Sequence, residues 1–124
     1  MEFYKCKHCG NIVTFLHNSG APLSCCGEQM QKMPENTTDA SVEKHVPVMQ
    51  KDGNVITVKI GSVTHPMEAN HYIMWIVLQT KTGYMVKKLK AGEAPEAVFE
   101  LTAGYEVVKV YEYCNLHGLW SAEA

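Results

Sequence analysis

The sequence of 124 residues contains no arginine, so all eleven of its basic side chains are lysines, against thirteen acidic residues. The resulting net charge of -2 supplies no basic field that would attract a polyanion. The bidentate guanidinium forks that favour phosphate recognition are also missing. We therefore expect no nucleic-acid partner.

Long apolar segments are missing as well. The longest run, YIMWIVL (72–78), is far too short to span a membrane, and the N-terminal MEFYKCKHCG has no apolar stretch typical of a signal peptide. These features indicate a soluble cytoplasmic protein with no membrane partner. In that reducing compartment, its five cysteines are expected to bind metal or to do redox chemistry rather than form disulfides.

The chain divides into a small cysteine-rich lobe and a larger strand-rich region. A polar connector, QKMPENTTDAS (31–41), separates them, and we place the domains at residues 1–36 and 37–124. The period of the second region is that of strands, and no stretch is convincingly an amphipathic helix. Short strands with this spacing predict a mainly β fold, an antiparallel sandwich of immunoglobulin-like type. The strand-like segments are NVITVKIG (54–61), YIMWIVLQT (72–80), YMVKKL (84–89), AVFEL (97–101) and YEVVKVYEY (105–113).

The first lobe holds four cysteines in the pattern CKHC, fifteen residues, then CC: Cys6, Cys9, Cys25 and Cys26. The lobe is too small to fold by apolar burial alone, and four thiolates suit a tetrahedral zinc or iron ion whose binding supplies folding free energy. The adjacent pair replaces the second CxxC of a zinc ribbon, so we expect a distorted second knuckle. A purely structural metal knot and an electron relay both fit this pattern.

Four histidines of the second region fall in loops or at strand ends, where sandwich folds build their sites. Pro66 disfavours helix at Thr64 and His65, so residues 65–71 form a loop that could present two imidazoles to one point. The short spacing of CNLH lets a thiol and an imidazole reach the same metal. The candidate ligands are His45, His65, His71, His117 and Cys114.

This mixed shell suits iron, copper or zinc by ligand softness. If the four imidazoles lie in a plane with the thiolate below, a sixth position stays open, which is unusual for zinc and normal for redox-active iron. With ferrous iron the centre carries a charge of about +1, and a cationic, reducible metal attracts a small anion.

The segments EKHVP (43–47), GSVTHPMEANHYI (61–73) and EYCNLHGLW (112–120), preceded by CKHC and CC, resemble the desulfoferrodoxins, the two-iron superoxide reductases. The resemblance covers essentially the whole chain. It implies a desulforedoxin-like lobe whose four cysteines bind one iron, followed by a sandwich whose four histidines bind a second iron in the equatorial plane, with Cys114 as axial ligand. The loop between His65 and His71 carries Ala69 and Asn70, where relatives tend to be more charged.

The resemblance further implies one-electron reduction of superoxide to hydrogen peroxide, as a defence against oxidative stress. Lys44 would attract superoxide and position a water that delivers a proton, and Glu43 would bind the oxidised iron. Taken alone, these two residues would more often be solvated loop charges than functional groups. The family also suggests rubredoxin or a similar small protein as electron donor, and a homodimer.

Two other functions are compatible with these residues. One is a zinc-ribbon-like module fused to a metal-storing or electron-carrying sandwich, and the other is a superoxide dismutase that would also release oxygen. No dinucleotide or flavin fingerprint is present, so electrons must come from a separate donor. Trp120, beside the ligand turn, is expected to fill the core or to shield the Cys114 side of the metal.

Overall fold

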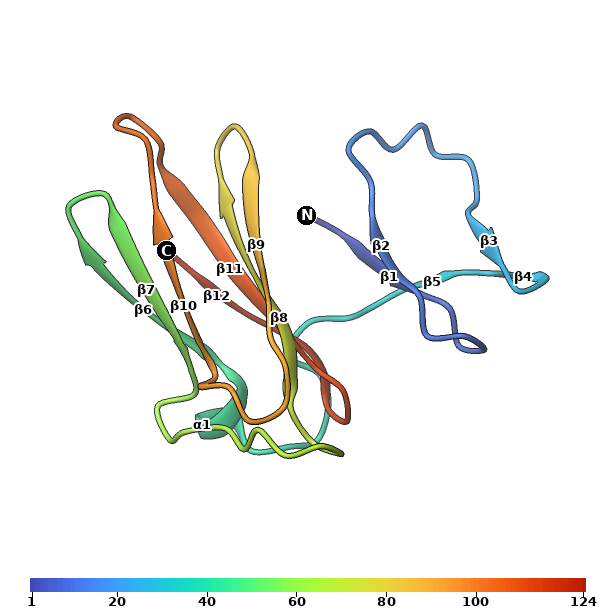
Figure 1. Ribbon diagram of the computed structural model, residues 1–124. Coiled ribbons are helices and arrows are strands. Elements are labelled where there is room, and N and C mark those ends of the chain that lie inside the picture. The colour runs from blue at the N-terminus through green and yellow to red at the C-terminus, as the bar shows by residue number, and fades with distance from the viewer. The chain divides into compact units, whose positions relative to one another are not determined.

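The computed structural model describes all 124 residues, which form two compact units, Met1–Pro34 and Glu35–Ala124 (Figure 1). Both units consist almost entirely of antiparallel strands, as the sequence pattern predicts. The single helix, α1 (Val42–His45), has four residues. No helix in the structure therefore has the length and apolar character needed to cross a bilayer.

The first unit has very little apolar core. Its three-stranded sheet has the order β2-β1-β5, and a two-stranded hairpin, β3-β4, lies beside its cysteines. Only Phe3, Cys6 and Met30 are buried in this unit. So few apolar contacts cannot hold a fold of this size, and another source of stability is required. The strands are β1 (Phe3–Lys5), β2 (Ile12–Thr14), β3 (Ser24–Cys25), β4 (Glu28–Gln29) and β5 (Gln31–Lys32).

The second unit is the predicted antiparallel sandwich. One sheet has the strand order β10-β7-β6 and the other has the order β12-β11-β8-β9. The seven strands are β6 (Pro47–Asp52), β7 (Val55–Ile60), β8 (Ile73–Thr80), β9 (Tyr84–Lys88), β10 (Glu96–Glu100), β11 (Val107–Cys114) and β12 (Gly118–Glu123). The mainly β, immunoglobulin-like architecture expected from the spacing of the apolar segments is thus confirmed.

Alternation of apolar and polar residues decides which side chains enter the sandwich. In β7, Ile56, Val58 and Ile60 are buried while the residues between them are more exposed, because successive side chains of a strand point to opposite faces. On β11 the same period of two brings Val110 and Cys114 into the apolar core cluster. The side chain of Cys114 therefore lies in the interior of the sandwich.

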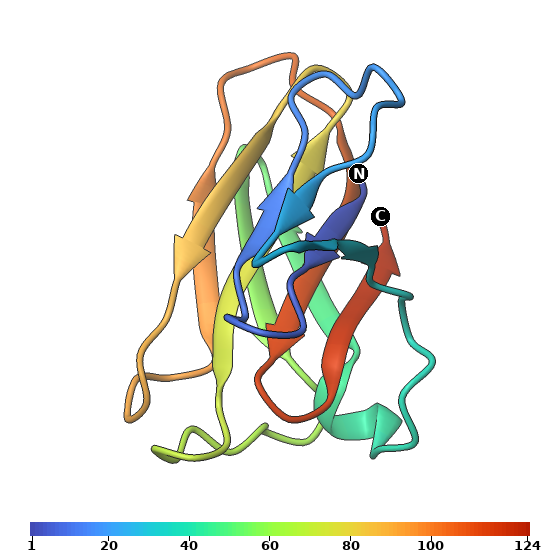
Figure 2. The same ribbon diagram turned by 90° about the vertical axis from the view of Figure 1, so that its right-hand side faces the viewer.

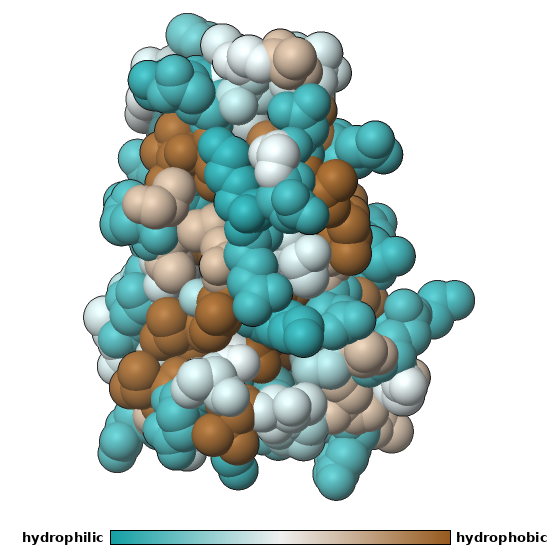
Figure 3. All heavy atoms as spheres, turned by 90° about the vertical axis from the view of Figure 1, so that its left-hand side faces the viewer, coloured by the Kyte–Doolittle hydropathy of each residue, from teal (hydrophilic) through white to brown (hydrophobic).

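All the loops that carry the predicted histidines gather at one end of this unit. Figures 1 and 2 show α1, the loop between β7 and β8, and the turn between β11 and β12 side by side at that end. Viewed from the side of β6 and β7, the surface shows apolar patches separated by hydrophilic side chains (Figure 3). The predicted metal-binding histidines thus lie at the end of the sandwich and not on this sheet face.

Candidate metal centres

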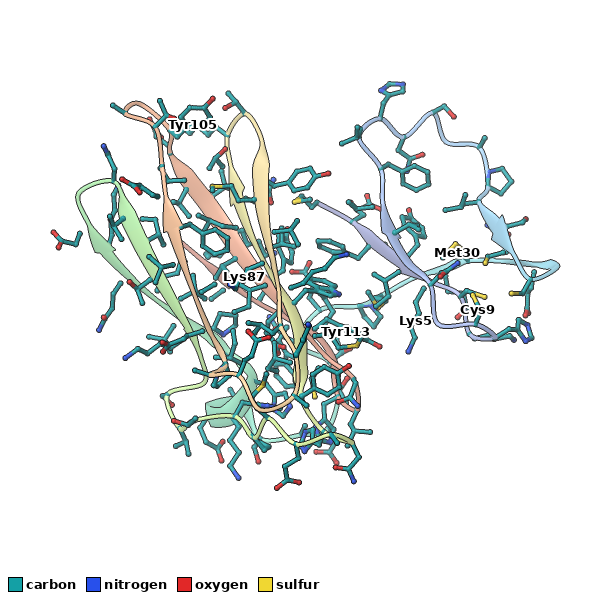
Figure 4. All side chains as sticks on the ribbon, in the orientation of Figure 1. Lys5, Cys9, Met30, Lys87, Tyr105 and Tyr113 are labelled. Atoms are coloured by element: carbon teal, nitrogen blue, oxygen red, sulfur yellow. The ribbon has the colours of Figure 1, made fainter.

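The four cysteines of the first unit form one cluster, here called the four-cysteine site. Cys9 lies in the turn after β1 (Figure 4), and the ligand atoms of the four residues all lie within 4.8 Å of one another. The Sγ atoms of Cys9 and Cys25 are 3.6 Å apart and those of Cys25 and Cys26 are 3.9 Å apart. Thiolates at 2.3 Å from a tetrahedral ion would be about 3.8 Å apart, so the spacing fits a metal.

Backbone and side-chain N–H groups point at these sulfurs. The amide of Cys9 donates to Cys6 Sγ at 3.5 Å, and this bond lowers the pKa of Cys6 to about 6. The neighbouring thiols Cys9 and Cys6 raise the pKa of Cys26 to about 12, because they favour its protonated form. One thiol ionises easily while another resists, so a cation is needed before all four become thiolates.

The adjacent pair at the second knuckle requires an unusual backbone. Cys26 has φ 52°, a left-handed conformation uncommon for a residue that is not glycine, and Gly27 follows with φ 75°. This turn lets the Sγ atoms of consecutive residues approach the same point instead of diverging. The distortion expected for a CC pair in place of a second CxxC is observed.

The second cluster, here called the four-histidine site, combines residues from three parts of the second unit. His45 ends α1, His65 and His71 belong to the loop between β7 and β8, and Cys114 and His117 flank the turn between β11 and β12. Ligand atoms of the first four lie within 4.8 Å of one another. His117 completes the set, because its Nδ1 lies 3.1 Å from His45 Nε2 and 3.9 Å from Cys114 Sγ.

The four imidazoles form a square. Ring centroids of neighbouring rings are 4.7–5.1 Å apart with interplanar angles of 78–85°, whereas the centroids of His45 and His71 are 6.5 Å apart with an angle of 29°. His45 and His71 therefore occupy opposite corners. The Nε2 atoms of His45 and His65 are 3.2 Å apart. Two nitrogens bound at right angles, about 2.1 Å from one metal, would be about 3.0 Å apart, so the set fits a planar four-nitrogen shell.

Backbone carbonyls determine which ring nitrogen is free in two of these histidines. His45 Nδ1 donates to Ser41 O at 2.7 Å, and His65 Nδ1 donates to Pro66 O at 2.6 Å. Both rings must then present Nε2 as the unprotonated atom, which is the form that binds metal. Burial lowers the pKa of His45 and lowers that of His65 to about 4, so both imidazoles are neutral at physiological pH.

The thiol of Cys114 lies beneath this square on the protein side and is fully buried. Burial raises the pKa of the Cys114 thiol. The backbone N–H groups of His117 and Leu116 lower this pKa, because they stabilise the thiolate, but their effect is smaller. The carboxyl of Glu112, two residues earlier, is also fully buried and has no hydrogen-bond partner. Burial raises the pKa of Glu112 well above its ordinary value and so favours its neutral form, whereas the ionised form would raise the pKa of Cys114 further.

Exposed side chains also border the four-histidine site. His71 and His117 are partly exposed, and Glu43 and Lys44 of α1 are exposed. Burial lowers the pKa of His71 most, and the ammonium of Lys44 lowers it further. The positive charge of Lys44 therefore acts on an imidazole of the site, whereas the thiol of Cys114 is buried.

The backbone of Glu43 and Lys44 is held by the loop that follows β7. Val63 N–H donates to Glu43 O at 2.9 Å, and Gly61 N–H donates to the carbonyl of Val46 at 3.2 Å. Gly61 has φ 82°, and a Cβ there would lie 2.7 Å from Glu43 O and 2.8 Å from Lys44 C. The absence of a side chain at Gly61 thus permits a close backbone contact that positions both charged residues.

We expect Gly61→Ala to destabilise the second unit by about 2 kcal/mol, because the loop must move away from α1. Urea unfolding followed by the fluorescence of Trp75 and Trp120 checks this value, since both tryptophans lie in this unit. Gly53→Ala is the control, because Gly53 also has a positive φ of 58° but nothing within 4 Å of a Cβ. Equal effects of the two substitutions would contradict this account.

The structure brings together all nine side chains that the sequence motifs single out, in two separate clusters. Trp120 is buried in the core, as expected: its ring stacks on His45 at 4.9 Å, and its Nε1–H donates to His117 O at 3.0 Å. The sequence motifs did not identify Gly61 or Asn115 as functional residues, because both act through contacts with segments distant in the sequence. The only indications in the sequence were a glycine four residues before His65 and an asparagine inside the CNLH turn.

Comparisons with known families agree with the two clusters. A family model described as Desulfoferrodoxin matches residues 37–123, and one described as Desulfoferrodoxin, N-terminal domain, matches residues 1–33. A protein named desulfoferrodoxin from Nitratidesulfovibrio vulgaris is 54% identical over 123 residues, covering 99% of this chain and 96% of its own. Another of that name, from Syntrophotalea carbinolica, is 52% identical with the same coverage.

The fold also has a solved counterpart. The crystal structure of the superoxide reductase from Treponema pallidum matches with a TM-score of 0.83 and 39% sequence identity, and the match covers 98% of each chain. Both units of the present chain are thus represented in a single known protein of that name.

Proposed function

Since the chain belongs to the desulfoferrodoxin family, we propose that it is a superoxide reductase, an oxidoreductase with two iron centres. It reduces superoxide by one electron, and two protons complete hydrogen peroxide without release of dioxygen. The observation that carries this function is the square of four imidazoles over a buried thiol. Five donors in this arrangement fit iron better than zinc, which prefers a tetrahedral shell.

Each residue of the four-histidine site has a defined task. His45, His65, His71 and His117 would hold the iron in their plane and Cys114 would hold it from the interior. Ferrous iron held there supplies the single electron. The buried position of Cys114 keeps water away from the thiolate, so substrate and protons approach from the solvent side of the site, where His71 and His117 are partly exposed.

Lys44 and Glu43 act at this approach. The ammonium of Lys44 attracts the anionic substrate to the site, and it orders the water that delivers a proton. Glu43 supplies a carboxylate that can reach the oxidised metal, a hard ligand for a harder ion. The backbone contacts of the Gly61–Val63 loop with Glu43, Lys44 and Val46 keep the backbone of this segment in place.

The direct test is metal analysis followed by anaerobic titration. The purified protein should contain two irons per chain, and the reduced four-histidine centre should be oxidised by superoxide with about one hydrogen peroxide formed per centre. Dioxygen and peroxide are measured in the same sample. Release of dioxygen in proportion to peroxide would indicate dismutation, and a colourless zinc protein without a superoxide-dependent spectral change would exclude the proposed reaction.

We expect Lys44→Ala to reduce the second-order rate constant with superoxide roughly tenfold or more, a loss of about 1.4 kcal/mol, while both irons stay bound. Pulse radiolysis at low ionic strength measures this constant. Lys51→Ala is the matched control, because it removes the same charge near the far end of β6, about 20 Å along the strand from His45. An unchanged rate constant for Lys44→Ala, or an equal loss for Lys51→Ala, would reject the role of Lys44.

We also propose an electron donor, an oligomeric state and a cellular location for the enzyme. The electron that restores the ferrous state comes from an external donor, for which rubredoxin or a similar small iron protein is the candidate. We also propose a homodimer that works in the cytoplasm in defence against oxidative stress. The four-cysteine iron either relays electrons or holds the first unit together, and metal-centre variants of that unit separate these roles.

A further inference from the structure

We propose that Asn115 is the positioning residue that holds His71 in the four-histidine site. The inference rests on the proposed iron centre and adds a residue outside the ligand set. Asn115 lies in the turn between Cys114 and His117, and its side chain reaches across to the loop that carries His71. One residue thereby joins the two segments that together provide four of the five ligands.

Asn115 makes three hydrogen bonds with the residues that directly precede and follow His71 in the chain. The Tyr72 N–H donates to Asn115 Oδ1 at 2.9 Å, and Asn115 Nδ2 donates to Asn70 O at 3.0 Å. The backbone N–H of Asn115 donates to Tyr72 O at 3.2 Å. The residues immediately before and after His71 are therefore both bound to Asn115, which restricts where its imidazole can lie.

His71 depends on this restraint more than the other loop ligands do. The rings of His45 and His65 are oriented by their own bonds to backbone carbonyls. No carbonyl bond of this kind orients the ring of His71, and its buried Nε2 has no hydrogen-bond partner, which suits an atom reserved for a metal. Its orientation must come from the backbone, and the backbone is where Asn115 acts.

The internal bonds of the loop do not replace Asn115. Glu68 and His71 exchange two backbone hydrogen bonds, of 2.9 and 3.1 Å, which close the turn on itself. These bonds fix the shape of the turn and not its position relative to Cys114. The regular pairing of β8 and β11 shifts register between Tyr113 and Cys114, so the ladder does not continue evenly into this region. At the next position Asn115 N–H still donates to Tyr72 O, but Asn115 Oδ1 replaces the backbone carbonyl as the acceptor for Tyr72 N–H, and Nδ2 adds a bond to Asn70 O.

The test compares iron release from three variants with that from the unaltered protein. Asn115→Ala removes both side-chain bonds but keeps the backbone bond, and we expect the reduced four-histidine centre to release iron to a ferrous chelator roughly tenfold faster. Asn115→Asp keeps the acceptor for Tyr72 N–H and loses the donor to Asn70 O, so its release rate should fall in between. The four-cysteine iron of the same chain is an internal reference and should be unaffected.

Leu116→Ala is the matched control, because it changes a half-exposed side chain of the same turn that provides no ligand and retains the Leu116 backbone N–H that favours the Cys114 thiolate. Two further measurements report on His71 itself: the electron paramagnetic resonance line shape of the ferric centre, and hydrogen exchange of the peptide 66–73. Both should change in Asn115→Ala and not in Leu116→Ala. Release within twofold of the unaltered protein, or equal effects in both variants, would overturn the proposal. If the unaltered protein holds iron but does not react with superoxide, the proposed function fails while the role of Asn115 stands or falls on the release rates.

Discussion

Replacing Cys114 by serine is expected to remove the thiolate-to-iron charge-transfer absorption of the oxidised four-histidine centre completely and to abolish superoxide reduction. Serine has nearly the same size, so the sandwich should remain folded. A serine hydroxyl does not ionise near neutral pH and is a harder donor than a thiolate. The loss is therefore one of charge and electron donation rather than of shape.

The position of Cys114 makes this effect large. Its side chain is fully buried in the apolar core cluster, so no solvent molecule can stand in for the missing thiolate. Four neutral imidazoles and ferrous iron would then leave a charge of about +2 at the edge of an apolar layer, in place of about +1 with the thiolate. Neutral Glu112 offers no compensating negative charge unless it ionises, which its burial opposes.

Absorption spectroscopy of the oxidised protein and anaerobic titration with superoxide measure the two consequences. Cys26→Ser provides the complementary variant, because it should alter only the spectrum of the four-cysteine site. If the charge-transfer band of the second centre persists in Cys114→Ser, a different residue supplies the axial thiolate. Since the chain has five cysteines and four belong to the other cluster, that outcome would also question the four-cysteine assignment.

The ligand identities could be predicted from the sequence because they lie in short, chemically distinctive segments. In CKHC, CC and CNLH the soft donor side chains are close in sequence, so they lie close in space independently of the rest of the fold. The strand-rich pattern also predicted the sandwich correctly, since alternation along segments such as 54–61 reflects one buried and one exposed face.

The square arrangement of the imidazoles could not be predicted in the same way. It depends on the register that sets Cys114 opposite Ile73, which places the turn of His117 beside the loop of His71. A register is a property of two strands and is not visible in either alone. The same holds for Gly61, whose contact with Lys44 joins segments sixteen residues or more apart, and for the link between Asn115 and Asn70.

The second large effect concerns the first unit. Cys6→Ser should unfold residues 1–34 while leaving the sandwich intact. Binding of a structural metal contributes about 10–16 kcal/mol in small zinc-dependent domains, and this unit buries only three residues without it. Cys6 is also the thiol whose ionisation the local backbone most favours, so its loss removes the ligand best prepared for the ion.

Hydrogen exchange measured by mass spectrometry distinguishes the two units in one experiment. Peptides covering β1 and β2 should lose protection in Cys6→Ser, whereas peptides covering β8 and β11 should keep it, because those strands form the largest sheet of the sandwich. Ser24→Ala is the control, as it changes an exposed residue beside Cys25 and leaves all four thiols in place. Retained protection in β1 and β2 of Cys6→Ser would mean that Phe3 and Met30 suffice as a core. In that case the four-cysteine metal would not be required for folding, and its role would be electron transfer.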